Sequence, residues 1–158
     1  LFAEAQATNC GRQVMLDRLF EVVLIQLLRH LMELGSTQAG LITGLAHPQL
    51  RHALAAIHQT PAQPWSVESL ASLAGMSRSV FANQFRDVVG ETPAGYLQRW
   101  RIGLGQKWLK NGQPLRLIAE EAGYSSEPAL SRAFKSQCGL SPKAWLVQEQ
   151  QRSLDARP

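Results

Sequence analysis

The sequence predicts an all-α fold: two helix-turn-helix units joined by a linker helix and preceded by a small helical segment. Three observations support this prediction. Apolar residues recur at spacings of three and four, and no segment keeps the alternation of a strand. One supersecondary unit is repeated in the second half of the chain. A stretch with two prolines and polar neighbours, residues 59–65, separates that half from what precedes it.

The composition is that of a compact folded chain. Of 158 residues, 45% are apolar and 18% charged, which excludes a disordered or fibrous protein. Cys10 and Cys138 match no metal-ligand spacing, and we interpret them as reduced, packed thiols. The apolar stretch 22–28 is too short to cross a bilayer, so we expect no membrane partner. The first residue is not Met and no signal-peptide pattern follows, so we expect the chain to be part of a longer protein.

Two helices are expected before the proline-containing stretch. The first spans about 14–34 and is ended by Gly35. Its apolar stripe consists of Leu16, Leu19, Val23, Leu27 and Leu31. The second spans about 48–58, with Pro48 in its first turn. We therefore divide the chain into a helical segment at 1–58, a linker at 59–65, a double helix-turn-helix domain at 66–150 and a tail at 151–158.

The repeat sets the organisation of the second half. At an offset of 48, Ala71 matches Ala119 and Gly75 matches Gly123. At an offset of 49, the matching pairs include Phe85 with Phe134, Gly90 with Gly139 and Pro93 with Pro142. One residue inserted at 124–126 explains the change of offset. The second half therefore holds two copies of one unit.

Each copy is typical of a helix-turn-helix. In the first, Ser66 caps a short helix that ends at Gly75, where a left-handed backbone is expected. The second helix of this unit runs from 77 or 78 to 89. In the second copy Gly123 occupies the turn, and the second helix spans about 127–138. The apolar faces of these second helices carry Phe81, Phe85, Val88, Leu130 and Phe134, which we predict to be core.

A linker helix is predicted between the copies. Thr92 and Pro93 supply its cap and first turn, and Asn111-Gly112 ends it after about residue 110. Such a helix is roughly 27 Å long. It could hold two reading helices near the pitch of B-DNA, roughly 34 Å, as successive major grooves require. Ser141-Pro142 repeats the cap for a final helix to about residue 150.

The charge of the chain is concentrated in its second half. Residues 1–65 carry four basic and four acidic groups, whereas residues 66–158 carry twelve basic and eight acidic ones. Between Arg78 and Lys110 the count is six basic to two acidic. This excess favours an anionic partner, a nucleic acid or a membrane surface.

These segments resemble a known family. Residues 75–93, and above all the segment IAEEAGYSSEPALSRAFK at 118–135 with Gly-Leu-Ser-Pro at 139–142, are similar to the DNA-binding domain of AraC/XylS-type transcriptional regulators. The resemblance covers about 64–148. Residues 11–29 are further similar to the last helices of the cupin-type sensor domain in one branch of that family.

The resemblance implies a function and partners. It implies a cytoplasmic, nucleoid-associated regulator that binds double-stranded DNA by placing two recognition helices in adjacent major grooves, without a cofactor. Residues 1–58 would be the end of a sensor or dimerisation domain that is otherwise missing from the chain. RNA polymerase is a candidate partner, as is a second copy of the chain through residues 14–34.

The resemblance also implies which residues meet DNA. The family's base-facing positions fall on Ser79, Ala82, Asn83, Glu127, Pro128, Ser131 and Arg132. Asn83 suits adenine, and Arg132 suits guanine or a phosphate. Ala82 offers only a methyl contact, and Glu127 and Pro128 stand where many members carry polar amides. The side chains better placed for the DNA backbone are Arg78, Arg86, Lys135 and Lys143. Each of these polar residues has a plainer interpretation as a solvated surface group.

Other functions find less support in the sequence. In an interaction module, residues 14–34 and 48–58 would form a dimerisation or docking surface, and DNA affinity would be nonspecific; the same stripe also suits packing within a monomer. An enzyme is not indicated, because the sequence has no glycine-rich phosphate loop and no nucleophile with a credible histidine partner. His47, His52 and His58 are five and six residues apart, a spacing that does not favour a metal site. The large aromatics that we interpret as packing residues are Tyr96, Trp100, Trp108 and Trp145.

Overall fold

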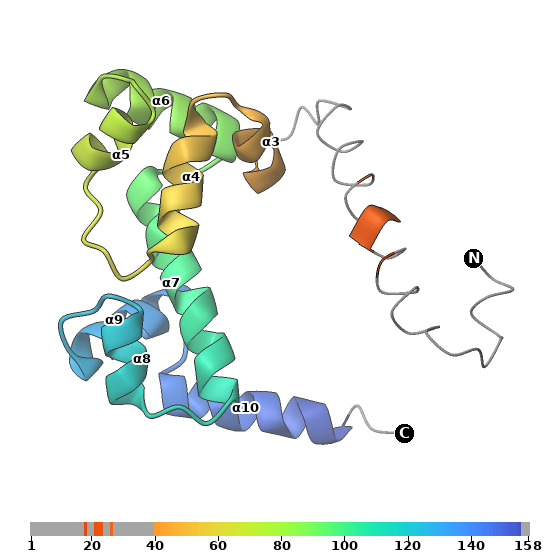
Figure 1. The fold of residues 1–158 in the computed structure, drawn as a ribbon. Helices are drawn as coiled ribbons and strands as arrows, with labels where there is room; N and C mark the ends of the chain where they lie inside the picture. The colour runs from red at the N-terminus through yellow and green to blue at the C-terminus, as the bar shows by residue number, and fades with distance from the viewer. Residues whose placement is uncertain (1–17, 19–20, 24–25, 27–39, 156–158) are drawn as a thin grey trace, which may run out of the picture.

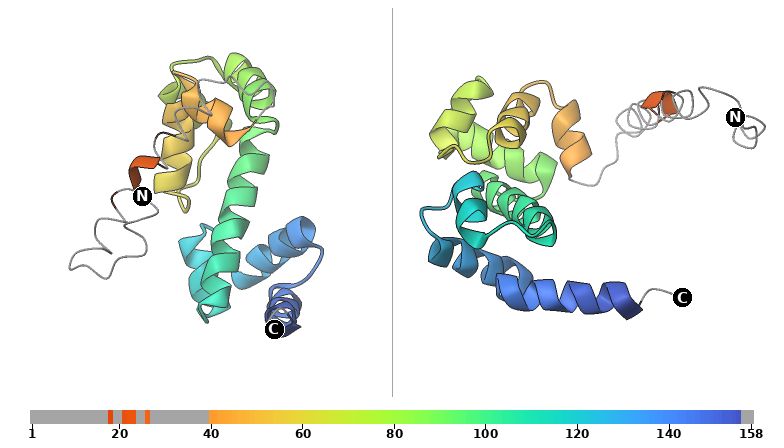
Figure 2. Two further views of the ribbon diagram at one scale, coloured as in Figure 1. Left: turned by 90° about the vertical axis from the view of Figure 1, so that its right-hand side faces the viewer. Right: turned by 60° about the horizontal axis from the view of Figure 1, so that its bottom comes forward.

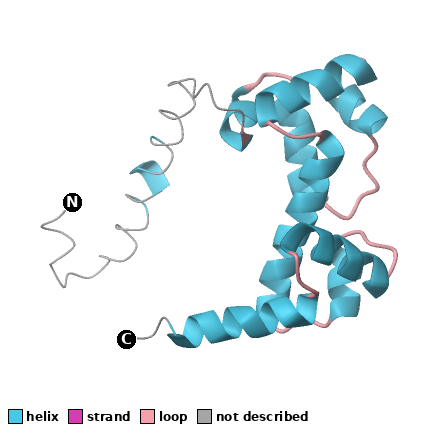
Figure 3. Cartoon of the chain, turned by 180° about the vertical axis from the view of Figure 1, so that it is seen from behind, coloured by secondary structure: helices cyan, strands magenta, loops and turns pink. Residues whose placement is uncertain are grey.

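The computed structural model describes residues 18, 21–23, 26 and 40–155, and within them every regular element is a helix (Figures 1 and 3). The helix expected at 14–34 falls mostly outside these residues. The helices from residue 40 onward are α3 (Leu41–Ala46), α4 (Leu50–Gln59), α5 (Val67–Leu73), α6 (Arg78–Val89), α7 (Pro93–Lys110), α8 (Leu115–Glu121), α9 (Glu127–Cys138) and α10 (Pro142–Asp155).

The long helix α7 is the spine of this arrangement. One group of helices, α3 to α6, surrounds its first half, and a second group, α8 to α10, surrounds its second half (Figures 1 and 2). Tyr96 and Leu97 of α7 are buried in the first group, whereas Ile102 and Leu109 are buried in the second. The linker helix therefore contributes buried residues to two hydrophobic cores, one for each copy of the repeated unit.

The first core extends beyond the helix-turn-helix formed by α5 and α6. Its centre is Phe81 and Phe85, both fully buried as predicted. Helix α4 adds four fully buried residues, Leu50, Ala53, Leu54 and Ile57. Burial of a large aliphatic side chain contributes about 1.5–3 kcal/mol, so α4 is a substantial part of what stabilises the first unit.

The continuous described segment 40–155 begins with a helix that the sequence did not suggest. Helix α3 contains Gly44, at which an added Cβ would lie 2.7 Å from Leu54 Cδ1, so the glycine permits close packing of α3 on α4. Helix α4 begins at Leu50, two residues later than expected. His47 Nδ1 accepts hydrogen bonds from the backbone N–H groups of Gln49 and Leu50, which places Pro48 in the turn before the helix.

The predicted turns are present in both units, and serine or threonine caps begin four of the helices. Gly75 and Gly123 have φ angles of 65° and 74°, the left-handed backbone expected at the two turns. Ser66, Ser77, Thr92 and Ser126 each accept a backbone hydrogen bond as N-caps. These caps begin α5, α6, α7 and α9 at the positions that the sequence predicts.

The second core repeats the first on a smaller scale. Leu130 and Phe134 of α9 are buried against Ile118 of α8, and the ring of Trp145 in α10 meets Phe134 edge-on, with centroids 5.6 Å apart. The packing role expected for the tryptophans is confirmed, because Trp100 packs against the first core, and Trp108 and Trp145 pack against the second. Helix α10 continues to Asp155, beyond the end expected near residue 150. Its Glu149 forms ion pairs with Lys110 and Arg152, which hold the later turns of the helix.

Candidate nucleic-acid interface

Helix α6 presents a polar face opposite its buried phenylalanines. Ser79, Asn83 and Arg86 are exposed on this face, and Ala82 is half-buried at its margin. Arg86 Nη2 donates a hydrogen bond of 3.3 Å to Asn83 Oδ1. This hydrogen bond uses the carbonyl oxygen of the Asn83 side chain. The Asn83 amide N–H groups take no part in it and can donate to an acceptor on a base edge.

Arg78 differs from the other predicted backbone ligands because its charge is balanced within the unit. Its Nε lies 2.7 Å from Glu68 Oε1, at the start of α5. Arg78 and a backbone hydrogen bond both lower the pKa of Glu68, and the backbone hydrogen bond has the larger effect. A phosphate contact by Arg78 would compete with this ion pair, so Arg78 is the weakest member of the predicted set.

Helix α9 is the counterpart of α6 in the second unit. The Ser126 hydroxyl caps it by accepting from the Ala129 N–H at 3.3 Å. Glu127 and Pro128 are exposed in the first turn, and an acidic group there is stabilised by the helix dipole. Further along, Arg132 is exposed and Ser131 half-buried. The structure thus gathers the four predicted positions on one helix, and their contact with bases stays a prediction.

The second unit carries four exposed basic side chains that form no ion pair within the described residues. Within the described residues, Arg99 is paired with Glu91 and Lys110 with Glu149. No ion pair is formed there by the exposed side chains of Arg116, Arg132, Lys135 and Lys143. Sequence reasoning overlooked Arg116, which stands in the first turn of α8. The first helix of a helix-turn-helix crosses the DNA backbone. A basic residue in the first turn of α8 is therefore the sequence signal that indicates Arg116.

His58 and Cys138, two of the residues weighed as metal ligands, are engaged in packing. His58 is half-buried, stacks on Trp100 with ring centroids 4.1 Å apart, and hydrogen-bonds the Tyr96 hydroxyl through Nε2 at 2.6 Å. Burial lowers the pKa of His58. Burial also raises the pKa of the Cys138 thiol, whose Sγ accepts a hydrogen bond from Gln106 Nε2. Within residues 40–155 the structure holds no cluster of three or more His, Cys, Asp or Glu side chains fit for a metal ion.

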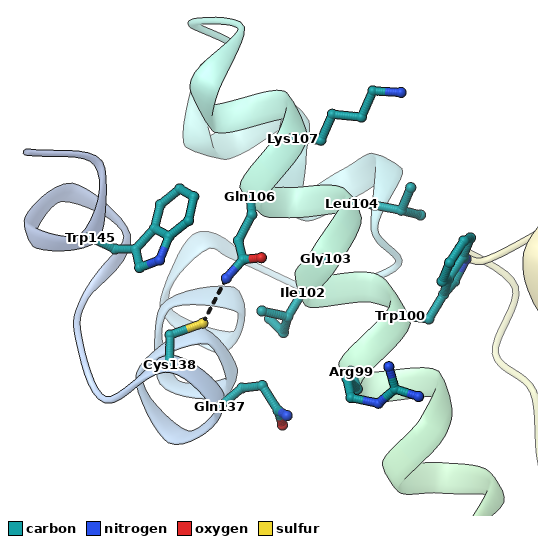
Figure 4. Close-up of a pocket in the computed structure, with 10 residues that line it drawn as sticks. All are labelled: Arg99, Trp100, Ile102, Gly103, Leu104, Gln106, Lys107, Gln137, Cys138 and Trp145. Carbon is teal, nitrogen blue, oxygen red and sulfur yellow. Dashed lines mark hydrogen bonds between the residues drawn. The ribbon is translucent and has the colours of Figure 1, made fainter. Parts of the chain in front are cut away.

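A cavity of about 700 Å³ lies between α7, the end of α9 and the start of α10 (Figure 4). Its walls include Trp100 and Trp145, and the hydrogen bond between Gln106 and Cys138 crosses one side. The titratable groups that line the cavity are the side chains of Arg99 and Lys107 and the Cys138 thiol, whose pKa is raised by burial. The lining includes no histidine or carboxylate that could accept a proton from that thiol.

Comparison with known proteins gives two family matches in different parts of the chain. Residues 70–148 match the family described as a helix-turn-helix domain, and residues 1–33 match a family described as cupin. The transcriptional regulator AlkR of Acinetobacter baylyi is 45% identical over 147 residues, which cover 92% of this chain and 48% of that protein. The activator RclR of Escherichia coli is 38% identical over 108 residues, which cover 68% of this chain and 38% of that protein. The chain spans about half the length, or less, of these curated relatives.

A solved structure with the same arrangement contains DNA. The DNA-binding domain of AdpA, in complex with a target DNA, is 29% identical and has a TM-score of 0.62, covering 67% of this chain and 96% of that domain. Two helix-turn-helix units on one shared helix define a double helix-turn-helix DNA-binding domain. The chain belongs to the AraC-type family of transcription regulators. The family is one of regulators and not of enzymes. The described helices include none long and apolar enough to span a membrane.

Proposed function

We propose that the chain is the DNA-reading part of a sequence-specific transcriptional regulator that inserts α6 and α9 into adjacent major grooves of one duplex. The observation that carries this proposal is the position of both helices on a single shared spine, the 18-residue helix α7. At 1.5 Å per residue the spine is about 27 Å long, comparable with the roughly 34 Å pitch of B-DNA. Similarity to a domain solved with its target DNA supports the same conclusion.

In this proposal the two reading helices contribute unequally. On α6, Ser79, Ala82 and Asn83 face the bases, Asn83 pairs with adenine, and Arg86 contacts the DNA backbone. On α9, Arg132 and Ser131 face the bases, and Glu127 accepts from a cytosine amino group beside Pro128. Backbone affinity comes mainly from Lys135, Lys143 and Arg86, with a smaller contribution from Arg78.

Selection of bound duplexes from a random pool, at near-physiological salt, tests this function. We expect a motif with two elements roughly one helical turn apart. A single short element would show that α9 serves only as a backbone clamp. Failure to enrich any motif, together with binding that weakens steeply with salt, would instead favour the alternative of an interaction module with nonspecific DNA affinity.

The extent of the DNA-binding unit follows from its core. We propose that the unit begins with α3 and α4, ahead of the division made at 59–65, because four residues of α4 are fully buried with α5 and α6. A chain that begins at residue 40 should then unfold cooperatively. A chain that begins at residue 66 should lose that transition, and equal urea midpoints for the two chains would contradict the proposal.

Two partners are proposed in addition to DNA, both within the nucleoid of the cytoplasm. Residues 14–34 form a homodimer surface, which the apolar stripe in their sequence supports. Light scattering should give the mass of two chains, and Leu27→Asp should give one; a wild-type monomer would refute the dimer. RNA polymerase is the second partner, and transcription from a template bearing the selected motif should change on addition of the whole regulator.

A further inference from the structure

The segment between α4 and α5, residues 60–65, is folded on itself, and we call it the strap. The Gln63 N–H donates to the Thr60 carbonyl at 3.2 Å, and the Trp65 N–H donates to the Gln63 carbonyl at 2.8 Å. The Trp65 indole Nε1 also donates to the Thr60 carbonyl, at 3.0 Å. Together these bonds make the strap a compact turn with a defined shape. Figure 1 shows it reaching from the first unit toward the second.

One side chain of the spine binds the strap and the second unit together. The Arg101 guanidinium donates from Nε to the Pro61 carbonyl at 2.7 Å and from Nη2 to the Gln63 carbonyl at 2.8 Å. Its Nη1 lies 3.4 Å from the carbonyl oxygen of Gly123, in the turn between α8 and α9. Because the planar guanidinium holds its N–H groups in fixed directions, these three acceptors define one position of the strap against that turn.

A second contact, independent of Arg101, joins the same two segments. A Cβ built on Gly123 would lie 2.5 Å from the Ala62 carbonyl oxygen and 2.7 Å from its Cα. Backbone therefore lies directly on backbone where the strap meets the turn. Gly123 therefore has two roles. Its left-handed backbone forms the turn, and its lack of a side chain lets the strap approach.

The middle of the spine holds two glycines, which lower its helix propensity. Gly103 and Gly105 lie where α7 passes from the first core to the second, and each glycine in a helix interior gives up stability relative to alanine. No atom lies within 4 Å of a Cβ built on Gly103, so packing does not require a glycine there. Bending at this point would change the separation of α6 and α9 while leaving both cores intact.

We propose that Arg101 is a positioning residue for DNA reading: it clamps the strap onto the turn of the second unit and thereby sets the distance and direction between α6 and α9. This inference rests on the proposed function for its meaning, but its geometry can be tested without DNA. It assigns Arg101 no contact with a base or a phosphate.

The first test measures the separation of the two units directly. Spin labels are placed at Ser72→Cys of α5 and Ser136→Cys of α9, both exposed, in a chain carrying Cys10→Ser and Cys138→Ser. We expect a narrow distance distribution for Arg101, a wider or shifted one for Arg101→Gln, and an intermediate one for Arg101→Lys. The control is Arg99→Gln, which removes the same charge from the same helix but leaves the strap contacts in place, because Arg99 pairs with Glu91 and lies over the Tyr96 ring. An unchanged distribution in folded Arg101→Gln overturns the proposal.

The second test connects this geometry to DNA. The affinity for the selected two-element site is divided by the affinity for a duplex in which one element is scrambled. This ratio measures how well both units bind DNA at the same time. Arg101→Gln should reduce this ratio by about tenfold and leave the one-element affinity near wild type, whereas Arg99→Gln should preserve the ratio. If the wild type itself binds both duplexes equally, the proposed function fails, and the label distances still decide the role of Arg101. A preserved ratio in Arg101→Gln overturns that role.

Discussion

Replacement of each turn glycine by alanine distinguishes the free-energy cost of a left-handed alanine from the cost of displacing the strap. Gly75 and Gly123 occupy the same place in the repeat and have similar φ angles of 65° and 74°. They differ in surroundings, because a Cβ at position 75 meets nothing within 4 Å, whereas one at position 123 meets the Ala62 backbone at 2.5 Å. Gly75→Ala is therefore a matched control for Gly123→Ala.

The magnitudes follow from these two environments. A left-handed alanine costs about 1–2 kcal/mol, which is the whole loss expected for Gly75→Ala. Gly123→Ala carries the same strain, and relief of the overlap with Ala62 adds about 1–3 kcal/mol, since backbone must move. The free energy of unfolding should thus fall by about 2–5 kcal/mol in Gly123→Ala.

Urea unfolding followed by circular dichroism measures both losses, and the slope of each transition shows whether unfolding remains cooperative. A difference of 1 kcal/mol corresponds to about 2–4 °C in Tm for a chain of this size. Equal losses in the two variants would refute the contact between strap and turn. A wild-type midpoint for Gly75→Ala would refute the left-handed turn of the first unit.

Four further predictions follow from the interface and the spine. Asn83→Ala should cost about 1–3 kcal/mol on the selected site and little on random DNA, and an equal loss on both would exclude a reading role. Arg86→Ala should weaken binding to all sequences and lower the salt slope by roughly one, so an unchanged slope would remove Arg86 from the phosphate ligands. Gly103→Ala should raise the free energy of unfolding by about 0.5–1 kcal/mol in urea, and a loss would contradict the open space around that position. Because burial lowers the pKa of His58 below that of the unfolded chain, the unfolded state binds the proton first; stability should fall as pH drops through the unfolded value of 6.5, and less steeply in His58→Gln.

The repeated units could be predicted from the sequence because their signals are local. Serine and threonine caps, the turn glycines and the phenylalanines at helical spacing each act within one or two turns of helix. Helices α5, α6, α7 and α9 accordingly begin where those signals lie. The exposure of the polar face of α6 follows from the same spacing, since this face lies opposite Phe81 and Phe85, whereas the base-facing positions on α6 and α9 are those that the family resemblance implies.

The features that the sequence did not predict depend on distant partners. Helix α3 was not predicted because two glycines, Gly40 and Gly44, lie at its start and in its interior. The contact with Leu54 of α4 explains Gly44, and that contact cannot be read from the local sequence. The pairing of Arg78 with Glu68 requires the angle between α5 and α6. Arg101 binds carbonyl groups, and every residue has a carbonyl, so no side-chain pattern indicates its partners.

Insertion of half a helical turn into the DNA tests the central claim most directly. The measurement is the affinity of the chain for the selected two-element site, compared with the same site carrying about five additional base pairs between the elements. If α6 and α9 read adjacent major grooves from one braced spine, the insertion moves one element to the far side of the duplex. Affinity should then fall to that of a single element, and an unchanged affinity would contradict simultaneous reading by both helices.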